Sequence, residues 1–196
     1  MAASDYFISG HFDSYKITSL SIARSDPANY YTANKRVTVF ISHKHEDLSD
    51  LMGVIGFLEK QYGVRCYIDG LDQTMPAVTS AETASKIKNR IKACDKFMLL
   101  ATTKAIDSKW CNWELGYGDS QKFQRDSLAI FPIKMKLESN ADFKGNEYMD
   151  LYPTVVFRDG MTKYRDGSMI EKDYYVKTKS QDGSFVLTPL SRWLKA

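Results

Sequence analysis

The feature that most constrains this chain is a regular alternation of short apolar runs and longer amphipathic runs between residues 36 and 135. Four of the short runs are rich in apolar and β-branched residues and predict strands: RVTVFIS (36–42), VRCYID (64–69), KFMLLAT (96–102) and SLAIFPIKM (127–135). A strand–helix alternation of this kind is typical of a parallel sheet covered by helices on both faces. We therefore predict an α/β fold.

Three amphipathic helices fill the intervals between these strands. In the first, over 48–62, apolar residues recur at steps of three and four, and Gly63 is placed to end the helix. The second covers 81–94; Ala84, Ile87, Ile91 and Cys94 form its apolar stripe, while its lysines and arginine fall largely on the solvated side. The third covers 108–123.

The pattern changes after residue 136, where Asp-Gly pairs separate strand-like runs. Asp-Gly between such runs is a strong β-hairpin signal, so we expect hairpins added to the edge of the sheet and a closing helix in TPLSRWLKA. A chain of 196 residues with 43% hydrophobic content fits one domain. We assign 35–196 to it, with a core over 36–135 and a β-rich part over 136–196, and interpret 1–34 as a surface extension.

Charge, apolar runs and cysteines limit the partners and the location. The net charge of +3 is small and scattered, which disfavours a nucleic-acid partner. The N-terminus lacks the basic and apolar segments of a signal peptide, and the longest apolar run, FMLLA, is too short to span a bilayer. Three cysteines without a CxxC spacing give little support for disulfides or zinc. We expect a cytoplasmic protein that uses neither membrane nor metal.

Common catalytic motifs are absent from the sequence. It contains no glycine-rich phosphate loop after a strand and no GxSxG nucleophile motif. His43 and His45, two residues apart on an extended chain, point to opposite sides and are interpreted as surface polar residues. Cys111, between two tryptophans, is interpreted as a packed hydrophobic residue.

Glu114 is the candidate that remains, because it lies in the apolar segment SKWCNWELGYG. With Ser108 as helix cap, the spacing places Trp110, Glu114 and Tyr117 on one helical face. Ligands in α/β sheets gather at the carboxyl ends of the strands, and this helix follows such an end. Two interpretations stay open at this point: a functional carboxylate between aromatic rings, or a rim glutamate whose head group stays in water.

Four segments, in order, resemble a Toll/interleukin-1 receptor (TIR) domain: VTVFISHKHED, RCYIDGLDQT, IKNRIKACDKFMLLAT and SKWCNWELGYG. The resemblance covers about 36–135 and is particularly close to bacterial and plant members. The later segment YYVKTKSQDGSFVLTPLSRWL also resembles the tail of stand-alone bacterial TIR proteins. It implies a flavodoxin-like fold. In the enzymatic branch of the family it implies cleavage of NAD⁺, as substrate and without a further cofactor, at the nicotinamide–ribose bond.

The resemblance also implies roles for individual residues. Glu114 corresponds to the catalytic glutamate, Trp110 to the aromatic residue beside the substrate, and Ser42 and His43 to the loop that helps hold NAD⁺. Asp69 begins the segment to Ser80 that matches the BB loop, which closes over the ligand and joins neighbouring domains. The DQTMPAVTS stretch of this segment departs from the basic or glycine-rich turn of many relatives.

Two functions of different classes remain open from the sequence. The first is an NAD⁺ glycohydrolase or cyclase that makes ADP-ribose or a cyclic ADP-ribose-type signal for a separate effector, a role that bacterial relatives fill in anti-phage defence. The second is a non-catalytic TIR–TIR interaction module, because one fold hosts many functions.

Overall fold

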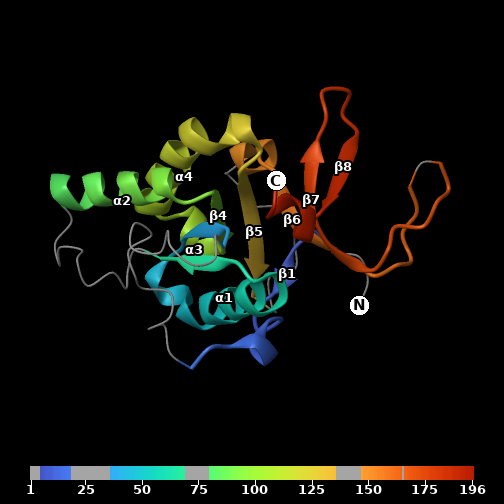
Figure 1. Ribbon diagram of the computed structural model, residues 1–196, viewed down its shortest axis with the longest axis horizontal. Helices are drawn as coiled ribbons and strands as arrows, with labels where there is room; N and C mark the ends of the chain where they lie inside the picture. Colours follow the sequence, from blue (N-terminus) through green and yellow to red (C-terminus); the bar gives the residue numbers. More distant parts are fainter. Residues whose placement is uncertain (1–4, 19–35, 69–79, 136–146, 165) are drawn as a thin grey trace.

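The computed structural model describes residues 5–18, 36–68, 80–135, 147–164 and 166–196, which form an eight-stranded sheet between helices (Figure 1). The strands are β1 (Phe7–Ile8), β2 (Thr38–Ser42), β3 (Arg65–Tyr67), β4 (Lys96–Ala101), β5 (Leu128–Lys134), β6 (Thr154–Arg158), β7 (Asp173–Lys179) and β8 (Phe185–Pro189). The helices are α1 (Leu48–Tyr62), α2 (Ala81–Ala93), α3 (Thr103–Ile106), α4 (Lys109–Lys122) and α5 (Leu190–Trp193), with 3₁₀ turns η1 (Asp13–Tyr15), η4 (His45–Asp47), η6 (Phe123–Arg125) and η7 (Glu147–Leu151). The α/β prediction is confirmed.

The strand order is β3-β2-β4-β5-β6-β7-β8, and β1 lies beside β5. Strands β3, β2, β4, β5 and β6 are mutually parallel. Their order across the sheet is that of the flavodoxin-like arrangement. None of the described helices is both long enough and apolar enough to cross a membrane.

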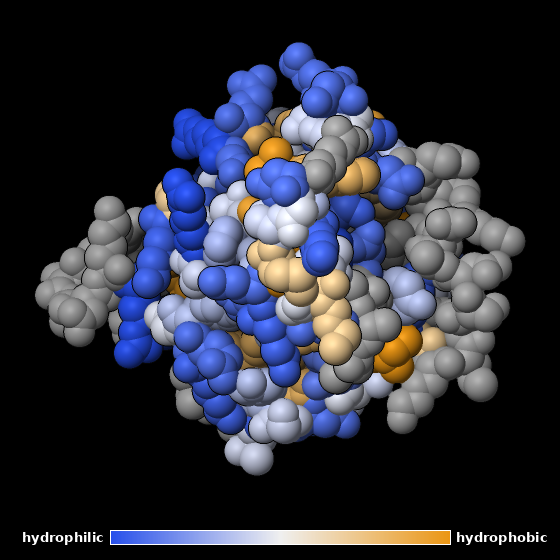
Figure 2. Space-filling model, turned by 90° about the vertical axis from the view of Figure 1, so that its right-hand side faces the viewer, coloured by the Kyte–Doolittle hydropathy of each residue, from blue (hydrophilic) through white to orange (hydrophobic). Residues whose placement is uncertain are grey.

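The C-terminal part adds antiparallel strands, as the Asp-Gly signals predicted. β7 pairs antiparallel with β6 and with β8 at the end of the sheet. The β7–β8 turn contains Gly183 in a left-handed conformation, with φ 78°. The β7–β8 hairpin and the 159–172 connection project on the right of Figure 1, the side that faces the viewer in Figure 2. The predicted closing helix is a single turn, α5, whose Trp193 is 1% exposed.

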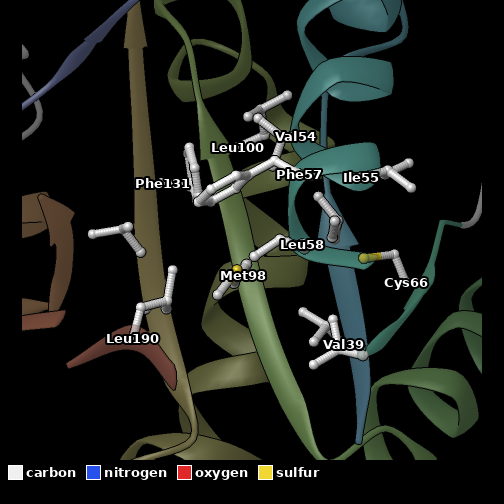
Figure 3. Close-up of a cluster of buried hydrophobic side chains, with 14 of the residues drawn as sticks. Val39, Val54, Ile55, Phe57, Leu58, Cys66, Met98, Leu100, Phe131 and Leu190 are labelled. Atoms are coloured by element: carbon white, nitrogen blue, oxygen red, sulfur yellow. The ribbon is translucent and has the colours of Figure 1, made fainter. Parts of the chain in front are cut away.

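Two buried clusters fix the layers of the fold. On one face of the sheet, α1 packs against β2, β4 and β5, and Figure 3 shows Phe57 and Leu58 of α1 over Met98, Leu100 and Phe131. Leu190 of α5 closes the same cluster. On the other face, residues of α2, α3 and α4 form the second cluster with β4 and β5. The sheet is therefore covered on both faces, as the apolar strands require.

The three predicted helices are confirmed, with small changes. Helix α1 ends at Gly63, whose φ is 66°. Helix α2 begins with a capping box between Ser80 and Thr83, and Ile87 and Ile91 of its predicted stripe are buried. Helix α4 begins directly after its cap, Ser108. The short helix α3 was not predicted.

The interpretation of the N-terminal residues as a surface extension is wrong for 5–18. β1 pairs parallel with β5, with Phe7 opposite Ile133 and Ile8 opposite Lys134. Phe7 and Phe12 are each 3% exposed and belong to the main core cluster. A strand of two residues carries too little pattern to be recognised in the sequence. Residues 19–35 lie outside the described part, and the boundary at residue 34 stays a prediction.

Two residues of α1, Gly56 and Asp50, hold the N-terminal segment against the helix. A Cβ atom at Gly56 would lie 1.9 Å from the carbonyl oxygen of Tyr15, so only glycine permits this approach. The carboxylate of Asp50 accepts hydrogen bonds from Ser9 Oγ (2.8 Å) and from the backbone N–H of Gly10 (2.9 Å). The segment is thus an integral part of the layer that contains α1.

Candidate functional site

The candidate site lies where β2 and β4 end side by side. After β2 the chain goes to β3, which lies on one side of β2 in the sheet. The next connection crosses back to β4, which lies on the other side of β2. Connections that run in opposite directions from neighbouring parallel strands leave a crevice outside the carboxyl ends of those strands, the usual ligand position in this fold class. Ser42 is the last residue of β2, and Thr102 directly follows β4.

Helix α4 brings an acidic side chain to this point. The hydroxyl of Ser108 accepts a hydrogen bond from the Cys111 N–H at 3.4 Å and starts the helix. Cys111 and Leu115 are each 1% exposed, and the packing interpretation of Cys111 is confirmed. A Cβ atom at Gly118 would lie 2.9 Å from the Phe97 ring, so this glycine allows α4 to lie close to β4. The close packing places the turn with Glu114 over the strand ends.

Ser42 and Glu114 form a buried pair. Glu114 is 1% exposed and Ser42 is 0% exposed. The Ser42 hydroxyl donates a hydrogen bond of 2.5 Å to Oε2 of Glu114. Of the two interpretations left open by the sequence, the rim glutamate with a solvated head group is therefore wrong. A carboxylate is costly to bury, and hydrogen bonds offset that cost.

The loop that follows Ser42 is also partly buried. His43 is 8% exposed, and its Nδ1 lies 3.3 Å from the carbonyl oxygen of Ile41. The interpretation of His43 as a surface residue is wrong, because the loop folds inward at the strand end. His45 is exposed, as expected. The structure thus brings Ser42, His43 and Glu114 to the same edge of the sheet.

A second polar pair, which the sequence reasoning missed, links the two strand ends. The Thr102 hydroxyl donates a hydrogen bond to the carboxylate of Asp47 and accepts one from the Ala105 N–H at 3.0 Å. Burial raises the pKa of Asp47, and the bond from Thr102 opposes that shift. Thr102 comes directly after β4, and Asp47 lies in the turn that follows β2. Their positions at two strand ends were the signal in the sequence that could have indicated this pair. The pair fixes the β2–α1 loop relative to the end of β4.

Half-buried aromatic rings follow one another along the side of α4 that packs against the second core cluster. The rings of Trp110 and Trp113 stack with centroids 4.8 Å apart, and Trp113 continues to Tyr117 at 6.3 Å. The Lys88 ammonium lies 5.6 Å from the Trp113 ring centroid and 5.5 Å from that of Tyr117. The predicted spacing of Trp110 and Tyr117 holds, but Trp113, which we had not singled out, connects them. We name Trp110, Trp113 and Tyr117 the aromatic ladder.

The remaining predictions concern the substrate-binding residue Asp69, metal binding and the cysteines. Asp69 lies outside the described residues, as does most of the segment matched to the BB loop. Within the described ranges, no group of three or more histidine, cysteine, aspartate or glutamate side chains is arranged to hold a metal ion. The cysteines Cys66, Cys94 and Cys111 are buried free thiols.

Comparison with known proteins places this geometry in a family. A family model described as TIR domain matches residues 39–161, more than half of the chain. The chain belongs to the TIR domain family. Ser42, His43, Asp69, Trp110 and Glu114 all lie within the matched part of this TIR protein. Strands β7 and β8 and helix α5 lie beyond it.

This TIR protein is also similar to a bacterial protein named probable 3' cyclic ADP-D-ribose synthase ThsB', from Bacillus cereus (strain MSX-D12). The two are 31% identical over 127 residues, which are 64% of this chain and 63% of the relative. The match therefore spans less than two thirds of the relative's length.

Proposed function

We propose that this TIR protein cleaves NAD⁺ at the bond between nicotinamide and ribose, with Glu114 as the catalytic carboxylate. The observation that carries the proposal is the buried Ser42–Glu114 hydrogen bond at the carboxyl ends of β2 and β4. Membership of the TIR family and similarity to a protein named as a cyclic ADP-ribose synthase support it.

One carboxylate is sufficient for this reaction. Nicotinamide is bound to ribose as a pyridinium cation and leaves as a neutral ring, so no general acid is needed to protonate the leaving group, unlike in ordinary glycoside hydrolysis. Positive charge develops on the ribose as the bond breaks. Glu114 stabilises that charge, and its position away from water strengthens the attraction.

Ser42 has a positioning role in this scheme. Its hydroxyl holds Oε2 of Glu114 in a fixed orientation, which reduces the reorganisation needed when charge develops. Trp110, one turn before Glu114, offers a flat surface for the nicotinamide ring, and the stacked Trp113 supports it. His43 and Asp69 are proposed to contact the rest of NAD⁺.

The acceptor of the ribosyl group decides the product. Water gives ADP-ribose, and an atom of the same molecule gives a cyclic product, according to how the substrate folds in the site. The name of the relative favours a cyclic ADP-ribose-type product. Self-association through the TIR domain, a separate effector that senses the product, an anti-phage role and a cytoplasmic location are parts of the same proposal.

The test incubates the purified chain with NAD⁺ at high protein concentration and measures the release of nicotinamide by chromatography. Mass spectrometry then identifies the second product. Glu114→Gln keeps the side-chain size and an oxygen that can accept the Ser42 bond, but removes the charge. We expect turnover to fall by about two to three orders of magnitude, the usual loss for one charge-stabilising group.

Glu59→Gln is the matched control, because Oε1 of Glu59 accepts a structural bond from the Cys66 N–H at 3.0 Å. It should keep wild-type turnover. Equal turnover of folded Glu114→Gln and wild type would remove Glu114 from the mechanism. A folded wild-type chain that releases no nicotinamide under any of these conditions would favour the non-catalytic TIR–TIR module.

A further inference from the structure

The antiparallel extension formed by β6, β7 and β8 has two different faces. Alternate residues such as Val155 and Val176 point to the main core cluster. Their neighbours along the strands, Val156 and Tyr175, point to the opposite face. There they form a small separate cluster with Ile170, against Leu187. Ile170 comes from the 159–172 connection, which folds back over this face through the bridge between Lys163 and Met169. A groove is left between the connection and the β7–β8 hairpin.

This groove, with a volume of about 560 Å³, combines apolar and cationic side chains. Tyr164, Phe185 and Leu187 supply its apolar walls. A second cavity of about 320 Å³ shares Lys177 and Phe185 with it and extends to Lys179. We name the larger one the arm groove.

The charges that line the arm groove are mainly positive. Arg158, Lys163 and Lys177 line it together with one carboxylate, that of Asp166. The Asp166 side chain accepts bonds from the N–H and the hydroxyl of Ser168, both within its own turn. Arg158 and Lys177 both form salt bridges with the carboxylate of Asp5, at 2.7 and 2.6 Å. The two cations therefore share one negative charge. The groove therefore keeps a positive excess that suits an acidic ligand.

Exposed apolar side chains surround the same region. Met161 is 83% exposed, Phe185 55% and Met169 50%. Figure 2 views the molecule from this side and shows hydrophobic side chains gathered among hydrophilic ones. Large exposed apolar groups gathered on one side of a protein are typical of a contact surface for another molecule.

The backbone of β8 adds hydrogen-bonding groups to this surface. Among the described strands β8 is the last of the sheet. Ser180 N–H donates to the Ser184 carbonyl at 2.8 Å, so Ser184 directs its carbonyl towards the β7 side of the hairpin. Because the bonds of an antiparallel pair alternate, Phe185 and Leu187 direct their N–H and C=O groups away from β7. An edge of this kind can accept a further strand.

We propose that the arm groove and the outer edge of β8 bind an extended acidic peptide segment of a partner protein, which adds to the sheet as a strand. Backbone groups of Phe185 and Leu187 pair with the peptide. Its carboxylates bind Lys163 and Lys177, and its apolar side chains contact Phe185. A second copy of this chain suits the surface less well, because it would bring one positive groove against another.

The probe is a fluorescein-labelled peptide of alternating glutamate and valine, with a peptide of alternating lysine and valine as the comparison, and the readout is fluorescence anisotropy. We expect the acidic peptide to bind with a Kd of about 10–100 µM, and at least tenfold more tightly than the basic one. Added salt should weaken the binding.

Two variants locate the binding on the protein. Lys163→Glu reverses an exposed charge of the groove and should weaken binding roughly fivefold, whereas Lys195→Glu, an exposed lysine of the C-terminal end, should leave it unchanged. Phe185→Pro removes the ring and an N–H group that the β7–β8 ladder does not use, and should abolish binding. Circular dichroism checks that each variant is folded.

Three results would overturn the proposal: no saturable binding of the acidic peptide, equal binding of the basic peptide, or no effect of Lys163→Glu. A fourth result that would overturn it comes from light scattering after size exclusion. If this shows a dimer that Phe185→Pro or Lys163→Glu dissociates, the occupant is a second copy of the chain and the peptide proposal is wrong. None of these results depends on NAD⁺ cleavage.

Discussion

Oγ of Ser42 lies 2.5 Å from Oε2 of Glu114, and neither side chain is more than 1% exposed. The two residues are 72 positions apart in the sequence, on a strand and on a helix that covers it. The pair joins the strand framework to the carboxylate that we propose to be catalytic.

Ser42→Ala tests how much this bond contributes. Removal of the hydroxyl takes one donor from a buried carboxylate, a loss of about 1–3 kcal/mol. We therefore expect kcat for nicotinamide release to fall about 10- to 100-fold, with little change in KM, because the bond orients a reacting group. Ser120→Ala is the control, since its exposed hydroxyl donates to the Tyr117 carbonyl and accepts from Nε2 of Gln121, both on the same helix. An unchanged kcat in folded Ser42→Ala would show that the bond is only structural.

Trp110→Ala tests the aromatic ladder as a substrate surface. The loss of one stacking ring costs about 1–1.5 kcal/mol, so KM for NAD⁺ should rise about tenfold. Trp113→Ala, which removes the ring that stacks on Trp110 at 4.8 Å, should give a smaller rise. Steady-state kinetics of both variants separates the two positions. A larger effect of Trp113→Ala would move the proposed contact from Trp110 to Trp113.

Gly56→Ala tests the attachment of residues 5–18. Its Cβ would meet the Tyr15 carbonyl at 1.9 Å, and because the contact atom belongs to the backbone, the segment must move. We expect a loss of about 1–3 kcal/mol in the free energy of unfolding by urea. Gly116→Ala on α4, where no atom lies within 4 Å of the added Cβ, should instead stabilise by about 0.5–1 kcal/mol. Similar values for both variants would contradict the close packing.

His11 predicts a pH dependence of stability in the same segment. Burial lowers the pKa of His11 from its ordinary value of 6.5, with the ring against Phe12 and its Nε2 3.3 Å from the Tyr174 hydroxyl. The unfolded chain therefore takes up a proton more readily than the folded one. The contribution of neutral His11 to the free energy of unfolding is fully present above pH 6.5. This contribution is lost as the pH falls through the lowered pKa of the folded state.

The measurement is thermal unfolding at pH 7.5 and 5.5. Wild type should melt at a lower temperature at pH 5.5, and His11→Gln should show a smaller difference because it has no ring to protonate. A difference of the same size in both proteins would assign the pH dependence to other groups.

The main features of the fold could be predicted because its signals are local. Buried parallel strands read as continuous apolar runs, and α1 and α4 carried clear end signals at Gly63 and Ser108. The position of Ser42 at a strand end agreed with the rule that ligands bind at the carboxyl ends of parallel strands. The roles of Ser42 and Glu114 were implied only by the resemblance to TIR domains, and their hydrogen bond was not predicted.

Other features could not be predicted because they depend on contacts between distant segments. Phe7 packs against the rings of Phe131 and Tyr174, far along the chain, and no local pattern encodes these contacts. Lys96 is only 1% exposed because its ammonium lies 4.6 Å from the Trp193 ring centroid and 3.2 Å from Ser127 Oγ. A lysine within a predicted strand gives no sign of such partners.

The pairing of β1 with β5 has a consequence for folding during synthesis. Phe7 is synthesised well before its neighbour in the sheet, Ile133, which follows 126 positions later in the chain. Until β5 has been made, β1 has no partner strand. Contacts between segments so far apart in the sequence also form slowly. Strand β1 is therefore expected to reach its native place only after β5 has been made, which makes this segment a point where a chaperone could act on the nascent chain.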